Sequence, residues 1–169
     1  MSGLQIVITW IIFLLNNGST PQNNTFTLGY GSIQTTQGAY ASPLFSDQAK
    51  VVDGTLQFKP NNNMRGLRYG ISTFYNENGT VMIGGGVSKT IAFKRLEFTT
   101  LFHPSYTYIG GIDNRRISFP INLRSSIDIG YRITNNVIIG GGYTHISNGT
   151  VTHPNNGLDI AKFTIGYHF

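Results

Sequence analysis

The stretch INLRSSIDIGYR, residues Ile121–Arg132, decides the fold. Its odd-numbered positions carry mainly apolar residues, whereas its even-numbered positions carry polar, charged and glycine residues. Successive side chains of a β-strand point to opposite faces, so this period of two predicts a strand with one apolar and one polar face. Two residues of the polar face, Arg124 and Asp128, are charged and lie well inside the stretch. Such a strand needs surroundings that accept charge on one face only.

The same alternation recurs from Asn24 to the end of the chain, between clusters of the turn-forming residues asparagine, glycine, proline and serine. The connections alternate between short and long ones, except for a tight turn at Asn76–Gly79, so we expect most long loops at one end of the sheet. We predict eight strands, at Asn24–Ile33, Ala49–Lys59, Arg65–Tyr75, Thr80–Ile91, Leu96–Gly110, Pro120–Ile133, Asn136–Ser147 and Leu158–Phe169.

The composition of the 169 residues fits membrane β-structure better than a soluble globule. Only 11% of the residues are charged and 40% are hydrophobic, while 12% are aromatic and 21 are glycine. Soluble domains average about 25% charged residues, and disordered chains contain few aromatic ones. In a small transmembrane barrel the apolar face of each strand meets lipid and the polar face fills the interior. We therefore predict an all-β fold, an eight-stranded antiparallel transmembrane β-barrel with a polar interior and no apolar core.

Both ends of the chain suggest export. The chain ends in Phe169, with aromatic or aliphatic residues at every second position before it, which resembles the C-terminal signature of bacterial outer-membrane barrels. The apolar run Leu4–Leu15 is too short for a membrane-spanning helix, which needs about 20 residues, but fits the apolar region of a signal peptide. No basic residue precedes it and no cleavage site of small residues follows. We interpret residues 1–20 as a degenerate or truncated signal peptide, with a buried strand or an expression artefact as alternatives, and residues 24–169 as the barrel domain.

Several kinds of site are disfavoured. The chain has no cysteine, and its four histidines lack the clustered carboxylates that would complete a metal site. The runs Gly84–Gly86 and Gly140–Gly142 lie within predicted strands and lack the lysine that completes a phosphate-binding loop. The pI of 9.6 raises the question of nucleic acid, but the basic residues are scattered and form no RNA-binding motif. We expect no metal and no nucleic-acid partner.

Two basic residues in a long connection suit another partner. Arg115 and Arg116 lie between the fifth and sixth predicted strands. If both chain ends are periplasmic, this loop faces the cell exterior, where the phosphate groups of lipopolysaccharide are located. We predict weak phosphate contacts for these two arginines, with a general solubilising role as the alternative.

The last two predicted strands bring three reactive residue types together. His145 and Ser147 are two residues apart and share the apolar face of their strand with Tyr143. Asp159 shares the apolar face of the last strand, and the hairpin between the strands brings it beside the other two. A carboxylate that orients an imidazole, which deprotonates a serine, is the arrangement of a serine hydrolase. The alternative is that these polar residues lie in the lipid headgroup zone without a catalytic role.

The same residues resemble the active-site hairpin of the PagL-type lipid A 3-O-deacylases. His145–Asn148 matches the family's His-x-Ser-Asn pattern, and residues 155–159 match the Asn-x-Gly-x-acid pattern that follows it. The strand from Ser125 to Arg132 is similar to the family's sixth strand. The likeness is strong over Ile121–Phe169, weaker from Gly66 and negligible over the first sixty residues.

The resemblance implies an outer-membrane hydrolase, with no cofactor, that removes the ester-linked 3-O-acyl chain of lipid A in lipopolysaccharide. It makes Ser147 the nucleophile, His145 the general base and Asp159 the orienting acid. Asn155, together with backbone N–H groups of Asn148–Thr150, would form the oxyanion hole.

The chain departs from the family at two of these positions. Asp159 stands where glutamate is more common, and Thr150 replaces a glycine that is common after the His-x-Ser-Asn pattern. The alternative function is a non-enzymatic eight-stranded outer-membrane barrel, an adhesin or a structural envelope protein. A soluble ligand-binding barrel is disfavoured by the outward apolar face, and a homodimer is left open as the oligomeric state.

Overall fold

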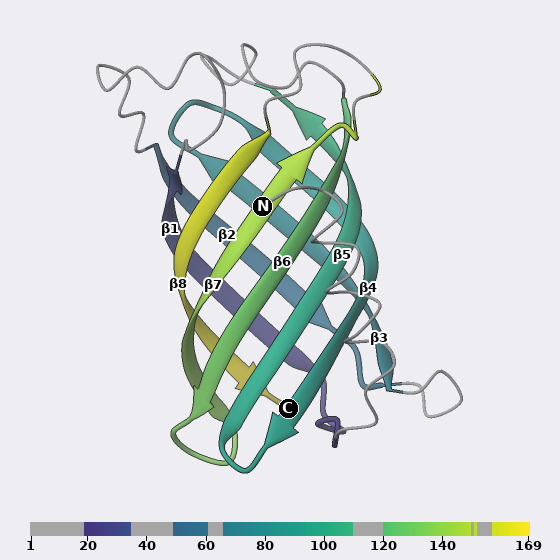
Figure 1. The fold of residues 1–169 in the computed structure, drawn as a ribbon, viewed down its shortest axis with the longest axis vertical. Coiled ribbons are helices and arrows are strands. Elements are labelled where there is room, and N and C mark those ends of the chain that lie inside the picture. The colour runs from purple at the N-terminus through teal and green to yellow at the C-terminus, as the bar shows by residue number, and fades with distance from the viewer. Residues whose placement is uncertain (1–18, 35–48, 61–65, 110–119, 150, 152–156) are drawn as a thin grey trace.

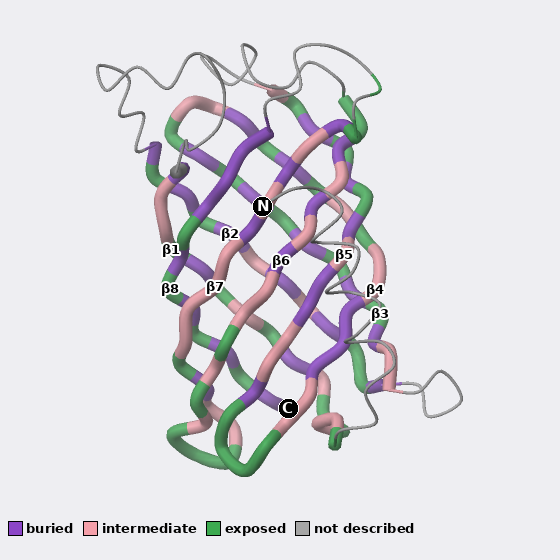
Figure 2. Tube along the Cα trace, in the orientation of Figure 1, coloured by how far each residue is buried: buried purple, intermediate pink, exposed green. Residues whose placement is uncertain are grey.

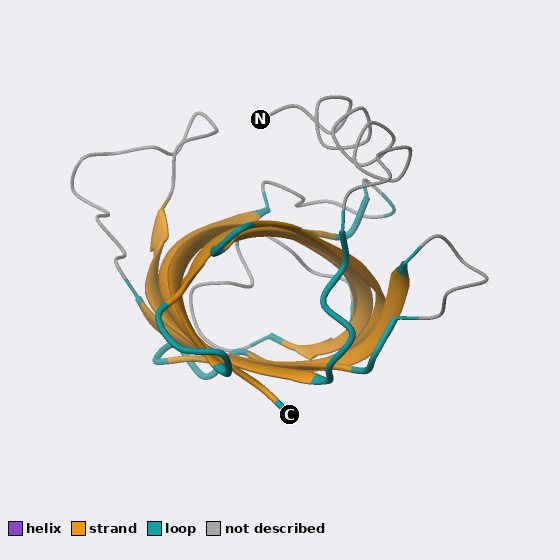
Figure 3. Ribbon diagram, turned by 90° about the horizontal axis from the view of Figure 1, so that it is seen from below, coloured by secondary structure: helices purple, strands orange, loops and turns teal. Residues whose placement is uncertain are grey.

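The computed structural model describes residues 19–34, 49–60, 66–109, 120–149, 151 and 157–169. These residues form one closed antiparallel barrel, in which each strand pairs with the next and β8 returns to β1 (Figure 1), as the view along the barrel axis shows (Figure 3). The predicted fold is confirmed, and each predicted strand boundary lies within two residues of the observed one. The strands are β1 (Thr25–Gln34), β2 (Lys50–Gln57), β3 (Leu67–Asn76), β4 (Val81–Phe93), β5 (Leu96–Tyr108), β6 (Ile121–Arg132), β7 (Val137–Ser147) and β8 (Leu158–His168).

The pairing of β1 with β8 closes the sheet. Ten residue pairs join the two strands, from Thr25 with His168 to Gln34 with Asp159. A closed barrel leaves no edge strand whose backbone groups would need another partner in lipid. The C-terminal ends of β1, β3, β5 and β7 lie at one end of the barrel, here called the loop end (Figure 1). The opposite end, called the turn end, holds the C-terminal ends of β2, β4 and β6 and the C-terminus of the chain.

The segment that leads into the barrel contacts the turn end. Ser19, which belongs to the predicted signal peptide, forms a bridge with Ala92 of β4, whose N–H donates to the Ser19 carbonyl at 2.8 Å. Residues 1–18 of the same predicted peptide lie outside the described residues. In the described part of the chain, no helix has the length and apolar character that a membrane span requires.

The two faces of the barrel wall have opposite polarity. Buried and exposed residues alternate along most of each strand (Figure 2). Large apolar side chains such as Leu28, Ile71 and Ile165 are exposed on the outside. Hydroxyl and charged side chains are buried inside, among them Arg124 and Lys162. This is the reverse of a water-soluble barrel and suits a wall surrounded by lipid.

Charged side chains of three strands meet inside the barrel. Asp53 of β2 accepts hydrogen bonds from Arg124 of β6 and from Nζ of Lys162 of β8, the latter at 2.9 Å. Nζ of Lys162 also lies 3.3 Å from Oδ1 of Asp128. Gly142 faces this group, and a Cβ there would collide with the Asp128 carboxylate. We call these four charged residues the lumen network; it joins strands that are not neighbours and offsets the cost of burying the charges.

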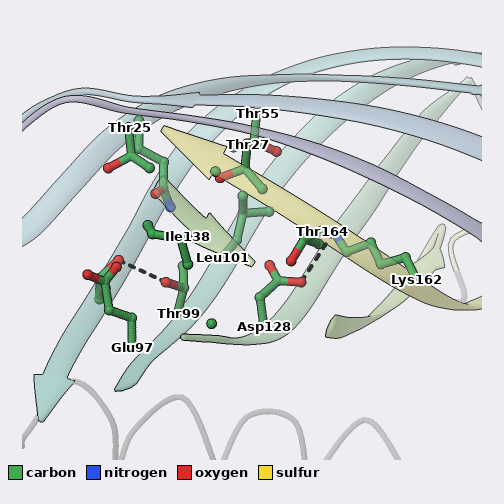
Figure 4. Close-up of a pocket in the computed structure, with 14 residues that line it drawn as sticks. Thr25, Thr27, Thr55, Glu97, Thr99, Leu101, Asp128, Ile138, Lys162 and Thr164 are labelled. Atoms are coloured by element: carbon green, nitrogen blue, oxygen red, sulfur yellow. Dashed lines mark hydrogen bonds and ion pairs between the residues drawn. The ribbon is translucent and has the colours of Figure 1, made fainter. Parts of the chain in front are cut away.

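A second polar network lies toward the turn end. Glu97 of β5 accepts hydrogen bonds from Arg132 and from Nε2 of His168, the latter at 3.0 Å. Nδ1 of His168 lies 2.9 Å from the Thr25 hydroxyl. The lumen here contains a cavity of about 40 Å³, lined largely by threonine side chains together with charged residues such as Asp128 (Figure 4). Figure 4 also shows the ion pair between Asp128 and Lys162 at its wall.

The loop end of the lumen is filled by apolar side chains, which the sequence analysis did not predict. The expectation of a barrel without an apolar core is therefore wrong at this end. The inward positions near the loop-end tips of several strands carry aliphatic or aromatic residues, and their mutual burial stabilises the closed wall. This apolar cluster consists of Ile33, Ala49, Val51, Phe74, Met82, Ile146, Leu158 and Ile160.

Candidate active site

His145 and Asp159 are direct cross-strand partners on β7 and β8. Nδ1 of His145 lies 2.7 Å from Oδ1 of Asp159. The two side chains occupy outward positions, because they alternate with the inward Ile146 and Ile160 of the apolar cluster. The His145 side chain is 26% exposed and the Asp159 side chain 10%, so the imidazole is accessible from outside while the carboxylate is shielded. A carboxylate at Nδ1 selects the tautomer with its proton on that nitrogen and leaves Nε2 free to act as a base.

Ser147 follows His145 on the same outward face and is partly exposed. Its register partner on β6 is Leu123. Between these described residues, the Ser147 hydroxyl makes no hydrogen bond to the imidazole, whose side-chain partner is Asp159. Hydrogen bonds between nucleophile and base are often long without substrate, and one rotation about χ1 moves a serine hydroxyl between staggered positions. The structure therefore places Ser147 next to the His145–Asp159 pair, but without a hydrogen bond between its hydroxyl and the imidazole.

Gly157, directly before β8, lies against the imidazole on the side of Cε1 and Nε2. Its φ of +71° is in the left-handed region that favours glycine. A Cβ at this position would lie 2.8 Å from Cε1 and 3.4 Å from Nε2 of His145. Any side chain here would strain the backbone and also press on the ring. This contact gives a physical reason for the glycine of the Asn-x-Gly-x-acid pattern at this position.

Sequence reasoning did not single out two further polar residues of the outer face. Tyr143 interacts with Asp159 of β8. Ser125 of β6 is the register partner of His145 on the side away from Asp159. The period of two already placed Tyr143 on the same face as His145, but its contact with Asp159 depends on the register between strands.

The predicted oxyanion residues belong to the connection after β7. Asn148 is buried, and its carbonyl accepts a hydrogen bond from the Val151 N–H at 3.3 Å. Thr150 and Asn155 lie outside the described residues, as do the predicted phosphate contacts Arg115 and Arg116. The structure therefore locates Asn148 and Gly149 of this group, directly after Ser147. Across the described residues, no three histidine or acidic side chains come together as a metal site would require.

Comparison with models of known protein families gives one match that covers most of the chain. The family model for lipid A 3-O-deacylase (PagL) matches residues 39–168. The chain belongs to the PagL family. The match covers β2 to β8 and includes His145, Ser147 and Asp159. It confirms the family that the sequence patterns suggested, whereas comparison with curated protein sequences gives no significant match.

Solved structures with a similar fold include outer-membrane barrels and designed transmembrane β-barrels. The outer membrane enzyme PagL has a TM-score of 0.58 at 12% identity, with 84% of this chain and 97% of that chain covered. Neisserial surface protein A also has a TM-score of 0.58, at 13% identity, with 89% and 99% covered. The N-terminal β-barrel domain of Pseudomonas aeruginosa OprF has a TM-score of 0.59 at 9% identity, with 88% and 98% covered. These identities show the fold alone; together with the family they identify a bacterial outer-membrane β-barrel.

Proposed function

We propose that this PagL-family barrel is a serine esterase that hydrolyses the ester-linked 3-O-acyl chain of lipid A in lipopolysaccharide. The observation that carries the proposal is the 2.7 Å hydrogen bond between His145 and Asp159 on the outer wall, with Ser147 next on the same face. Polar groups on a lipid-facing wall cost free energy and are usually retained for function. Lipid A occupies the outer leaflet, so a site near the loop end of the wall meets its substrate by lateral diffusion.

The proposed reaction has two steps. The Ser147 hydroxyl attacks the ester carbonyl while Nε2 of His145 takes its proton, and Asp159 stabilises the imidazolium through Nδ1. The tetrahedral intermediate then breaks the bond to the sugar oxygen, which receives the proton from His145 and leaves as the 3-hydroxyl group. This leaves the acyl chain on Ser147. A water molecule, deprotonated by His145, releases the fatty acid and restores the serine.

The remaining roles concern charge on the substrate. The oxyanion of each intermediate needs preorganised donors, for which we propose the Asn155 side chain and backbone N–H groups of Asn148–Thr150. Arg115 and Arg116 remain predicted contacts for the lipid A phosphates. Water is the only co-reactant that this reaction consumes.

Lipid A mass spectrometry tests the proposal directly. The barrel is expressed in a Gram-negative host, and lipid A is compared for wild type, Ser147→Ala and Ser125→Ala. We expect loss of one hydroxyacyl chain with wild type and with Ser125→Ala, and intact lipid A with Ser147→Ala. Activity that depends on Ser125 instead would show that the nucleophile is assigned wrongly. Intact lipid A in all three samples, with heat-modifiable gel mobility showing folded barrels, would favour a non-enzymatic surface barrel.

A further inference from the structure

Tyr143 is a residue of the outer face to which the proposed mechanism gives no role. It lies two residues before His145 on β7, and its register partner on β8 is Ala161. Asp159 is the next outward residue of β8, so it lies diagonally across from Tyr143. Diagonal neighbours on one face of a sheet are about 7–8 Å apart at Cα, within reach of an aromatic side chain. The small Ala161 leaves room for the phenol ring to extend over β8 toward the carboxylate.

The Asp159 carboxylate therefore has two side-chain partners. One is Nδ1 of His145 at 2.7 Å. The other is Tyr143, which interacts with Asp159 from its diagonal position on β7. An ionised carboxylate only accepts hydrogen bonds, so in a hydrogen bond between these two side chains the tyrosine hydroxyl is the donor. Hydrogen bonds to a charged group are stronger than those between neutral groups. Two donors approaching from different directions restrict the rotation of the short aspartate side chain.

We infer that Tyr143 is a positioning residue, which holds the Asp159 carboxylate in the rotamer that accepts the Nδ1–H of His145. The inference rests on the proposed function, in which this pair activates Ser147. The competing explanation is that Tyr143 is one of the tyrosines that anchor a barrel at the membrane interface. An anchoring tyrosine would act through its ring and its depth in the membrane, and its effect would not depend on the length of the acid at residue 159.

The first test is Tyr143→Phe, which removes one oxygen atom and keeps the ring. We expect kcat/KM for lipid A in detergent micelles to fall about tenfold, equivalent to about 1.4 kcal/mol, with the loss in kcat and with KM unchanged. The rate at which a fluorophosphonate probe modifies Ser147 should fall by the same factor, and this rate needs no lipid substrate. The matched control is Tyr131→Phe at an exposed, outward tyrosine of β6, which should leave both rates unchanged.

The second test asks whether a longer acid removes the need for the tyrosine. Glutamate has one more methylene and reaches further from the β8 backbone, so its carboxylate can meet the imidazole without the constraint from Tyr143. In an Asp159→Glu background, Tyr143→Phe should change the probe rate by less than about twofold. An equal tenfold loss in both backgrounds would overturn the positioning role.

The outcomes separate this inference from the proposed function. A Tyr143→Phe protein whose rates with lipid A and with the fluorophosphonate probe both equal those of wild type overturns the inference alone. A wild type that reacts with the probe at Ser147 but leaves lipid A intact overturns the proposed substrate, and the comparison of probe rates still decides the role of Tyr143. A folded wild type that is inert to both overturns the proposed function and the inference together.

Discussion

Replacing Asp53 with asparagine tests how far the lumen network stabilises the barrel. The Asp53 side chain is 5% exposed and accepts hydrogen bonds from Arg124 and Lys162. The four charges of the network balance in the native barrel, two positive against two negative. In Asp53→Asn the shape of the side chain is retained, but Arg124 and Lys162 are left with the single carboxylate of Asp128.

The expected loss of stability depends on which partners Lys162 and Arg124 keep in Asp53→Asn. Lys162 keeps Asp128, whose Oδ1 lies 3.3 Å from its Nζ. Arg124 keeps a hydrogen bond from Nη1 to the Thr73 carbonyl at 3.3 Å, but loses its carboxylate partner. Removing one partner of a buried ion pair costs about 3–5 kcal/mol. Because only one of the two cations is left without a carboxylate, we expect a loss of about 3 kcal/mol in the free energy of unfolding, roughly a hundredfold in the folding equilibrium.

Urea unfolding of the barrel in phospholipid vesicles, followed by far-UV circular dichroism and by heat-modifiable gel mobility, measures this change. Thr55→Ser, an inward uncharged substitution on the same strand, serves as the control and should cost less than about 1 kcal/mol. Adding Lys162→Met to Asp53→Asn restores the charge balance, so the double variant should recover about 1–2 kcal/mol. An Asp53→Asn barrel within about 0.5 kcal/mol of wild type would refute the reasoning, and so would a double variant less stable than the single one.

Two further predictions concern the hairpin of the candidate site. Asp159→Asn keeps the size of the side chain but removes the negative charge beside Nδ1 of His145. The rates of deacylation and of probe labelling at Ser147 should therefore both fall about 10³–10⁴-fold. Rates within tenfold of wild type would show that the carboxylate is not needed. Gly157→Ala should lower kcat at least about tenfold while the barrel still folds. The new Cβ would collide with the His145 ring, and alanine is also strained at the positive φ of this position. Gly79→Ala is the matched control, since its φ is +83° but no atom lies within 4 Å of the added Cβ; equal losses in the two alanine variants would contradict a specific contact with His145.

The strands and their outward faces could be predicted because each depends on local sequence. In a stretch such as Ile121–Arg132, the alternation of apolar and polar residues is present in the strand itself and does not depend on which strands it pairs with. The partners inside the lumen could not be predicted in the same way. Asp53 and Arg124 are 71 residues apart and belong to strands that are not neighbours in the sheet. Their meeting depends on the diameter and stagger of the closed barrel, which no single strand encodes.

The candidate site was predictable only in part for a related reason. The alternation of faces along each strand predicts that His145 and Asp159 lie on the same face of two neighbouring strands. This prediction does not depend on the length of the loop between the strands. Their contact requires one particular register, because a shift of two residues would keep the same faces and separate the pair. The residues between Ser147 and Leu158 are too many to set that register by turn geometry alone. The contact of Tyr143 with Asp159, one step further along the diagonal, depends on the same register.

The hairpin of β7 and β8 inverts the polarity of the barrel wall at the loop end. Over most of the wall, apolar side chains point outward and polar ones inward. Here the outward residues are His145, Ser147 and Asp159, while their inward neighbours belong to the apolar cluster. The backbone that carries the polar residues is thus packed from inside by aliphatic side chains, which gives the outward groups a rigid support.

The hairpin of β3 and β4 reaches the same end of the barrel and provides the comparison. Its inward residues Phe74 and Met82 also belong to the apolar cluster, yet its outward residues Tyr75 and Val81 are apolar and exposed. Closeness to the loop end therefore does not by itself require polar side chains on the outer wall. If the headgroup zone alone explained the polar residues of β7 and β8, the outward positions of β3 and β4 at this end should be polar as well. The described part of β1 and β2, next to β8, shows the same inversion, with Ser32 and Lys50 outward beside the inward Ile33 and Val51. The inversion therefore lies on one side of the barrel, which a headgroup zone around the whole barrel does not explain.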